Sequence, residues 1–193
     1  MKTKVTDSLR KGISKAALLC SLALIFTPAA ASADPMVSVT DGGTHEYNTD
    51  YTIDVPQNMV GTPAVYVGGL NGGTVRFKNN LTINNDTPMG SLMQPQGIQV
   101  NLQNTSGNAF VEVLGKAIIN TREVAVRADA YNGASYSAEI RLGDGSEINS
   151  ANNVAVSAHR SGLIAVGDGA KITGNSYGAT VATIVASSGG KVE

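Results

Sequence analysis

A seven-residue motif that occurs twice near the C-terminus constrains the fold of this chain more than any other feature. Leu-Gly-Asp-Gly-Ser-Glu-Ile occupies residues 142–148, and Val-Gly-Asp-Gly-Ala-Lys-Ile occupies residues 166–172, so each position recurs twenty-four positions later. Each copy places a Gly-Asp-Gly turn between apolar residues, which predicts strand, tight turn and strand. A contour of roughly 80 Å per repeat, at about 3.3 Å per extended residue, suits one lap of a narrow cylinder. The motif therefore predicts a solenoid of stacked laps.

Short apolar runs between glycines and asparagines extend this pattern toward the N-terminus. They lie at residues 37–39, 51–55, 64–67, 74–77, 81–83, 97–102, 109–114 and 124–126. A β-sandwich has turn signals at intervals of roughly 8–12 residues, whereas the signals in this chain are closer together. After residue 33, no window has the i, i+3, i+4, i+7 apolar spacing of a helix. We therefore expect an all-β chain wound into about six laps.

A second, longer spacing of thirty positions relates earlier segments to the repeat. It separates Ile118 from Ile148, and it also separates Val124 from Val154. The longer spacing exceeds the shorter one by six residues, which is the length of the segment Tyr-Asn-Gly-Ala-Ser-Tyr at residues 131–136. We therefore predict that one register holds across both strands and that residues 131–136 are an insertion.

Alternation along each strand should turn one set of side chains into the cylinder. Equivalent residues one lap apart would lie about 4.8 Å from each other, so Ile118, Ile148 and Ile172 should form an apolar column. Burial of each isoleucine would contribute roughly 1.5–3 kcal/mol. Small residues such as Ala155 and Ala179 would let the narrow interior fill. Asparagines at the bends tolerate left-handed backbone and can bond to their counterparts in the next lap.

Residues 1–33 have the composition of a secretory signal. Residues 1–15 carry five basic side chains and one acid, residues 16–26 are an apolar run, and the stretch ends in Ala-Ala-Ala-Ser-Ala. These features predict export by the Sec machinery and cleavage between Ala33 and Asp34. The apolar run is too short to span a bilayer as a helix, which needs about 20 residues.

Removal of this signal changes the charge and the cysteine content of the chain. The signal holds five of the 14 basic residues and one of the 15 acidic residues, so the remainder carries a net charge of about −5. No basic cluster survives, which argues against a nucleic-acid partner. The one cysteine, Cys20, follows Leu19, which is larger than the residue expected before a lipid-attachment site. The exported part must therefore be held by burial and backbone hydrogen bonds without disulfides.

Residues 34–58 are the least regular part of the exported chain, and we expect them to cap the first lap of a β-helix that occupies residues 59–193. His45 beside Glu46 in this region suggests a metal ligand. No second histidine, cysteine or carboxylate stands at ligand spacing, however. We therefore predict a surface histidine in a polar loop, and no metal site.

The sequence offers one candidate pair of catalytic acids. Asp144 and Asp168 are one lap apart and would stack about 5 Å from each other, within the range of carboxylate separations used in glycoside hydrolysis. Both stand inside Gly-Asp-Gly, where a turn itself favours aspartate, and the Gly-Gly-x-Gly-x-Asp repeat of calcium-binding β-helices is missing. His159-Arg160 could bind a sugar or an anion, or form a solvated bend. Three serines show no nucleophile-elbow context, namely Ser135, Ser161 and Ser187. We therefore assign no catalytic residue and no cofactor.

Taken together, these features resemble the N-terminal portion of an autotransporter, a type V secreted protein of Gram-negative bacteria. The resemblance rests on the signal through Ala33, on the cysteine-free body rich in glycine, asparagine and threonine, and on the motifs at residues 143–148, 167–172 and 186–192. It implies a pertactin-like or adhesin-like passenger domain that folds as a right-handed parallel β-helix. It also implies a C-terminal β-barrel that carries the passenger through the outer membrane.

The resemblance implies a structural or adhesive stalk, a surface factor of the virulence type. Its loops, Asn84–Gln96 and Tyr131–Tyr136, would meet a host-cell surface or a glycan. Parallel β-helices also serve as polysaccharide lyases and glycosidases, so an enzyme of that kind is the alternative. No barrel sequence is present, and the chain stops at Glu193 directly after a Gly-Gly turn. We therefore expect a fragment that stays in the periplasm and presents an open strand edge, whereas the full-length protein would be secreted or held at the cell surface.

Overall fold

The structure is a computed structural model that describes residues 36–87, 95–103, 107–130, 138–175 and 183–193. These residues form β-strands and the connections between them. The predicted signal peptide, with its cleavage site between Ala33 and Asp34, lies outside these residues, and so do Ala179, most of the Asn84–Gln96 segment and all of Tyr131–Tyr136. Within the described part of the chain, no helix has the length and apolar character needed to cross a membrane.

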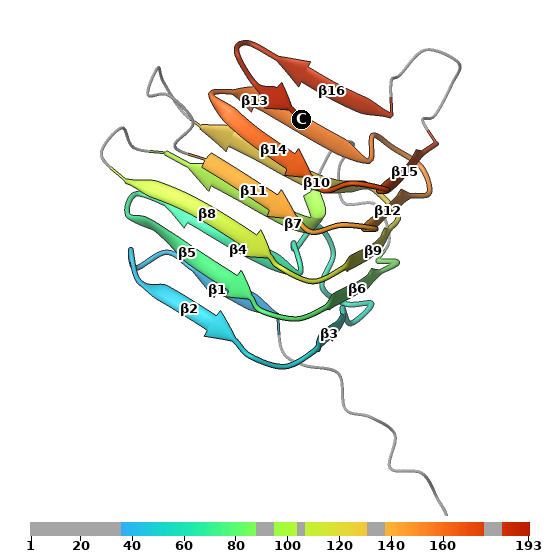
Figure 1. Ribbon diagram of the computed structural model, residues 1–193, viewed down its shortest axis with the longest axis horizontal. Helices are drawn as coiled ribbons and strands as arrows, with labels where there is room; N and C mark the ends of the chain where they lie inside the picture. Colours follow the sequence, from blue (N-terminus) through green and yellow to red (C-terminus); the bar gives the residue numbers. More distant parts are fainter. Residues whose placement is uncertain (1–35, 88–94, 104–106, 131–137, 176–182) are drawn as a thin grey trace, which may run out of the picture. The chain divides into compact units, whose positions relative to one another are not determined.

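Three parallel sheets form the wall of a solenoid (Figure 1). Sheet A contains β1 (Val37–Val39), β4 (Val65–Gly69), β7 (Pro95–Leu102), β10 (Val124–Ala130), β13 (Val156–Arg160) and β16 (Ile184–Ser187). Sheet B contains β2 (Thr44–Tyr47), β5 (Gly72–Phe77), β8 (Asn108–Val113), β11 (Ala138–Leu142), β14 (Gly162–Val166) and β17 (Lys191–Val192). Sheet C contains β3 (Tyr51–Asp54), β6 (Leu81–Asn85), β9 (Ala117–Thr121), β12 (Glu147–Ser150) and β15 (Lys171–Gly174).

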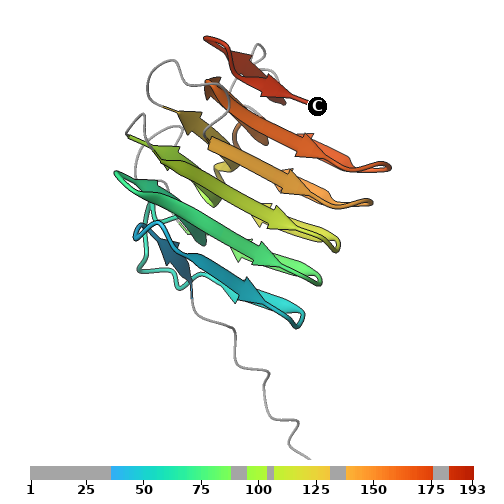
Figure 2. The ribbon, with the colours of Figure 1, turned by 60° about the vertical axis from the view of Figure 1, so that its left-hand side comes forward.

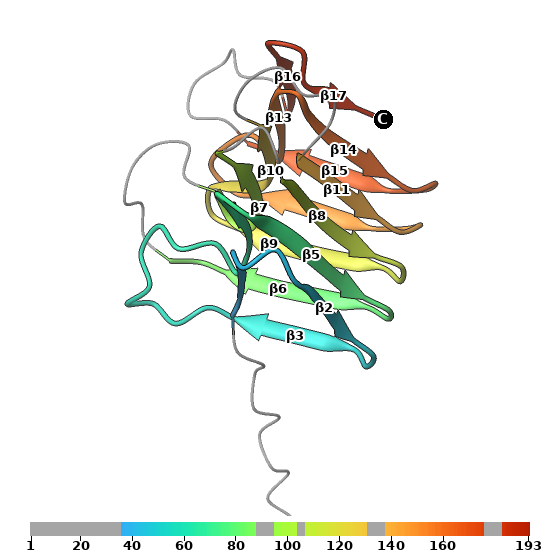
Figure 3. The same ribbon diagram turned by 90° about the vertical axis from the view of Figure 1, so that its left-hand side faces the viewer.

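The chain passes from sheet A to sheet B to sheet C and returns to sheet A one layer higher, as Figures 2 and 3 show from two further sides. Each strand therefore pairs in parallel with the equivalent strand of the next lap. Parallel neighbours need a crossover connection, which the strands of the other two sheets supply here. Such crossovers are right-handed in nearly all proteins. Five laps contain three strands each, and a sixth contains β16 and β17. The fold is the predicted right-handed parallel β-helix of about six laps.

The first lap comes from the region that we expected as a cap. Within residues 34–58, β1, β2 and β3 each pair in parallel with the second lap. Val37, Val39 and Ile53 are buried, so this region also contributes to the core.

The repeated motif occupies equivalent positions in two successive laps, as its spacing predicted. Leu142 pairs with Val166 in sheet B, and Ile148 pairs with Ile172 in sheet C. The Gly-Asp-Gly turns between these strands contain Gly145 at a φ of +66° and Gly169 at +71°, a left-handed backbone that glycine adopts without steric cost.

The predicted insertion explains why two spacings coexist in the fourth and fifth laps. Val126 of β10 pairs with Val156 of β13, which keeps the longer spacing, whereas Ile140 of β11 pairs with Ile164 of β14, which keeps the shorter one. The surplus arises between β10 and β11, where residues 131–137 stand in the place that Ser161 alone fills one lap later.

The core is a narrow interior filled mainly by aliphatic side chains from all three sheets, with Tyr51 and Phe77 as its buried aromatic residues. In sheet C the inward column contains Ile53, Ile83, Ile119, Ile148 and Ile172. The prediction of Ile118 in this column is therefore wrong by one residue, because Ile148 pairs with Ile119 and Ile118 pairs with Glu147. Side chains one residue apart in a strand point to opposite faces, and Ile118 is half-exposed while Ile119 is fully buried.

Candidate functional site

The outer face of sheet C carries a ladder of side-chain amides that crosses four laps. Asn84 Nδ2 donates to Asp54 Oδ1 at 2.8 Å, and Asn120 Nδ2 donates to Asn84 Oδ1 at 3.1 Å. Asn149 Nδ2 continues the series to Asn120 Oδ1 at 3.0 Å. The predicted bonding between asparagines of successive laps is confirmed, although these asparagines lie within strands. A cavity of about 450 Å³ borders this face, and the ladder residues that line it are already bonded to each other.

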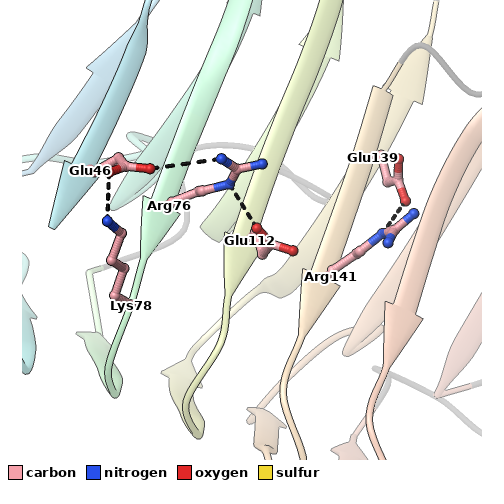
Figure 4. Close-up of polar contacts among 6 residues, drawn as sticks. All are labelled: Glu46, Arg76, Lys78, Glu112, Glu139 and Arg141. Carbon is pink, nitrogen blue, oxygen red and sulfur yellow. Dashed lines mark hydrogen bonds and ion pairs between the residues drawn. The ribbon is translucent and has the colours of Figure 1, made fainter. Parts of the chain in front are cut away.

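The outer face of sheet B carries a ladder of charges that crosses three laps (Figure 4). Glu46 Oε2 accepts from Lys78 Nζ at 2.7 Å, and its other oxygen lies 3.7 Å from Arg76 Nη1. Arg76 Nε donates to Glu112 Oε2 at 2.8 Å. The hydrogen bond from Lys78 is the largest cause of a lowered pKa at Glu46. Charges of alternating sign thus stabilise the stacking of the laps.

The charged column of sheet B continues to Arg141, which occupies the register position of Glu112 one lap higher. Arg141 forms an ion pair with Glu139 on its own strand, and its guanidinium carbon lies 5.8 Å from the ring centre of Phe110. Glu139 is the main cause of a raised pKa at Arg141. These side chains are therefore also held by neighbours within the sheet.

The structure places His45 in β2, so the prediction of a polar loop around this residue is wrong. His45 Nε2 lies 3.7 Å from Asp41 Oδ2, and both side chains are exposed. Glu46 next to it points into the charge ladder (Figure 4). Among the residues that the structure describes, no group of three or more histidine, cysteine, aspartate or glutamate side chains is arranged to hold a metal ion.

The candidate acid Asp144 makes a structural bond in the stack of Gly-Asp-Gly turns. Its Oδ1 accepts a hydrogen bond of 2.9 Å from the backbone N–H of Asp168 in the next lap. In return, the N–H of Gly145 donates to the carbonyl oxygen of Asp168 at 2.8 Å. The carboxylate therefore joins two turns, the role that the turn interpretation of these aspartates predicts.

A cavity also opens on the outer face of sheet A, between polar side chains of several laps. Its volume is about 400 Å³, and the described residues that line it are Asn101 and Gln103 from the third lap, Asp129 from the fourth and Arg160 from the fifth. Asn101 and Asp129 occupy the same register position in β7 and β10. The cavity therefore brings together two amides, one carboxylate and one guanidinium from three successive laps. We call these four residues the sheet A cleft.

Asp129 is the buried member of the sheet A cleft, with 5% of its surface exposed. Its Oδ2 accepts from Arg127 Nη2 at 3.0 Å. Its Oδ1 lies 3.3 Å from Arg160 Nε, an ion pair that does not form a hydrogen bond. The guanidinium groups of Arg127 and Arg160 thus hold the carboxylate in place. One of its two oxygens accepts a hydrogen bond, and the other forms only an ion pair.

Of the candidate pair His159-Arg160, Arg160 belongs to the cleft, and His159 occupies the register position of Asp129 in the next lap. His159 Nε2 lies 2.6 Å from Ser157 Oγ, and its Nδ1 lies 2.7 Å from Ser187 Oγ in the next lap. Burial is the main cause of a lowered pKa at His159, and the charge of Arg127 adds to it. A neutral imidazole donates through one nitrogen and accepts through the other, so both serine contacts are satisfied without a proton being taken up. Ser161 lies in the turn after β13, and Ser135 lies outside the described residues.

A second polar group, which the sequence analysis missed, lies inside the solenoid. Gln96 Oε1 accepts from the N–H of Glu123 at 2.8 Å, and Asn153 Nδ2 donates to Glu123 Oε2 at 2.9 Å. Gln96 Nε2 donates to Thr87 Oγ1 at 3.0 Å. Gln96 and Glu123 are fully buried, and these side chains satisfy most of the polar groups at one corner of successive laps, although Glu123 Oε1 accepts no hydrogen bond. Their position indicates a structural role.

Arg127, Asp129 and Gln103 were likewise missed as candidates, because only the stacking of laps brings Asp129 next to Arg160 and Gln103 to the same cavity. A signal did exist in the sequence, since Arg127 and Asp129 stand two residues apart on a strand and must share a face. Comparison of the chain with protein families, with curated proteins and with solved structures finds no match.

Proposed function

We propose that this chain is the β-helical part of an autotransporter passenger, a structural and adhesive stalk at the surface of a Gram-negative cell. The Sec machinery would export it by means of the signal that ends at Ala33. A β-barrel translocator in the outer membrane would then carry the longer protein to the cell surface, where it acts as an adhesin. The signal-like composition of residues 1–33 and the parallel β-helix support this proposal.

The observation that carries the proposal is the bonding of outer side chains along the axis of the solenoid. On sheet C the amides of Asn84, Asn120 and Asn149 bond from lap to lap, and on sheet B Arg76 bridges Glu46 and Glu112. Ladders of this kind satisfy polar groups between laps and reinforce each sheet along its length. They suit a spacer that holds its binding surfaces away from the membrane.

The alternative function, cleavage of a polysaccharide, would use the sheet A cleft. Glycoside hydrolysis commonly uses two carboxylates about 5–9.5 Å apart. Among the described residues that line this cleft, Asp129 is the only carboxylate, and it is paired with Arg127 and Arg160. This arrangement favours binding over glycoside hydrolysis, because the described lining offers no second carboxylate to complete the catalytic pair.

Export is tested by expressing the whole chain, from Met1 to Glu193, in a Gram-negative host. We expect the protein in the periplasmic fraction, with Asp34 as the N-terminal residue by mass spectrometry. A matched variant, Ala33→Arg, should remain unprocessed because the cleavage site requires a small residue. Cytoplasmic protein with an intact Met1 would contradict the export step.

Adhesion and catalysis are distinguished by two assays on the processed protein. We expect saturable binding to cultured epithelial cells and no release of reducing or unsaturated sugar ends from neutral or acidic polysaccharides. Time-dependent release of such ends, abolished by Asp129→Asn, would replace the adhesive proposal with the enzymatic one. Absence of both binding and cleavage would contradict both.

A further inference from the structure

The sheet A cleft has the dimensions and composition of a small-ligand site. Its volume of about 400 Å³ lies within the range of about 300–1,000 Å³ that such sites occupy, enough for one or two sugar rings. Laps stand about 4.8 Å apart, which is close to the length of one pyranose unit, so side chains from three laps can address successive positions of one ligand. Gln103 and Arg160 are exposed, and Asp129 is buried.

The four lining side chains include both hydrogen-bond donors and hydrogen-bond acceptors. The carboxamides of Asn101 and Gln103 each offer an N–H pair and a carbonyl oxygen, the guanidinium of Arg160 donates, and the carboxylate of Asp129 accepts. Sugar hydroxyls act as donor and acceptor at once, so adjacent hydroxyls match planar groups of this kind. Asp129 lines the cavity with a small part of its surface, and its Oδ1 lies 3.3 Å from Arg160 Nε.

The charges around the cleft argue against an ionic ligand. A cation approaching Asp129 would meet the guanidinium groups of Arg127 and Arg160, which already neutralise the carboxylate. An anion would have to compete with Asp129 for those same groups, and it would lie beside the carboxylate. A neutral molecule with several hydroxyls is neither repelled by the arginines nor forced to compete with Asp129.

We infer that the sheet A cleft binds a neutral saccharide, with Asp129 accepting hydrogen bonds from its hydroxyls and Asn101, Gln103 and Arg160 completing the contacts. The inference rests on the adhesive function proposed above and adds a site and a ligand class to it. It places recognition on the wall of the solenoid, formed by β7, β10 and β13 and by Gln103, which directly follows β7.

The test measures binding of the processed full chain to two immobilised panels. One panel holds neutral oligosaccharides of glucose, galactose and mannose, and the other holds uronate-containing, sialylated and sulfated oligosaccharides. The variants are Gln103→Ala, which removes an exposed amide, and Asp129→Asn, which keeps the shape of the carboxylate but removes its charge. The control is Glu112→Gln, which changes a paired carboxylate on sheet B. Circular dichroism and thermal melting establish that each variant is folded.

We expect the neutral panel to bind, with affinity reduced about tenfold or more in Gln103→Ala and Asp129→Asn and unchanged in Glu112→Gln. Should Asp129→Asn fail to fold, the exposed Gln103→Ala variant decides the result alone. Three outcomes would overturn the inference: no neutral saccharide binds, only acidic saccharides bind, or both cleft variants bind as well as the wild type.

A parallel cell-binding assay separates failure of this inference from failure of the proposed function. If the protein binds cells while the inference fails, the adhesive proposal stands and its binding surface lies elsewhere. If the protein binds neither cells nor any saccharide, the inference and the adhesive function fail together.

Discussion

The carboxamide of Asn120 donates a hydrogen bond of 3.1 Å to the carboxamide oxygen of Asn84 one lap below. Asn120 also accepts one from Asn149 one lap above, at 3.0 Å. The residue thus occupies the middle of the sheet C ladder, and its replacement removes two inter-lap contacts at once. An exposed polar side chain therefore has a definite structural task in this fold.

Asn120→Ala should lower the free energy of unfolding by about 1 kcal/mol, since an exposed hydrogen bond contributes at the lower end of roughly 0.5–1.5 kcal/mol. Urea denaturation monitored by circular dichroism measures the change. Thr173→Ala is the matched control, because Thr173 is an exposed residue at the same register position further along the column. An equal loss in both variants would show that the ladder bonds contribute nothing beyond β-propensity.

Ile119→Ala should lower the free energy of unfolding by roughly 2–5 kcal/mol, the cost of a cavity in a packed core. Ile118→Ala deletes the same atoms from the adjacent, outward-facing position and should cost far less. The two variants differ only in the face of β9 from which the side chain is removed. Equal costs in chemical denaturation would contradict the register of sheet C.

The stability of the protein should fall as pH decreases through about 6.5 because of His159. Burial lowers the pKa of this residue in the folded state below its ordinary value of 6.5, so the unfolded chain takes up the proton first. The contribution of His159 to the free energy of unfolding is therefore complete above pH 6.5 and declines below it. Thermal melting from pH 8 to pH 5 should show a smaller decline in His159→Gln than in the wild type. An unchanged decline would assign the effect to other groups.

A second loss of stability should appear in acid because of Glu46. The hydrogen bond from Lys78 lowers the pKa of Glu46 below its ordinary value of 4.5 in the folded state. Its contribution is present above pH 4.5 and is lost as pH falls through the folded-state pKa. Glu46→Gln and Lys78→Met should each flatten the melting profile between pH 5 and pH 3. In 1 M salt, where the Debye length is about 3 Å, the difference from the wild type should shrink.

The register of sheet C shows what sequence reasoning missed and why. Two adjacent isoleucines, Ile118 and Ile119, satisfy the same apolar pattern, and only one of them can face the core. Ile118 shares a face with Asn120, so turning Ile118 inward would bury the amide and break the ladder. The polar neighbour was the signal that could have resolved the choice.

The sheet A cleft shows the opposite case, in which local pattern carries little information. Gln103, Asp129 and Arg160 come from three laps, and their separations along the chain exceed the period of the recognised repeat. The lengths of the intervening connections decide which side chains become neighbours. Only the folded register brings them to one cavity.

The amino-acid sequence was enough to predict that this chain stacks strands in laps, because a motif that recurs at a fixed spacing with glycine at its turns has one regular way to bury its aliphatic residues. It also determined that asparagines of successive laps would bond to each other. The tertiary structure decided which residue of each strand faces inward and which polar side chains meet outside. That choice depends on the pairing of whole strands, because a shift of one residue exchanges every inner side chain for an outer one.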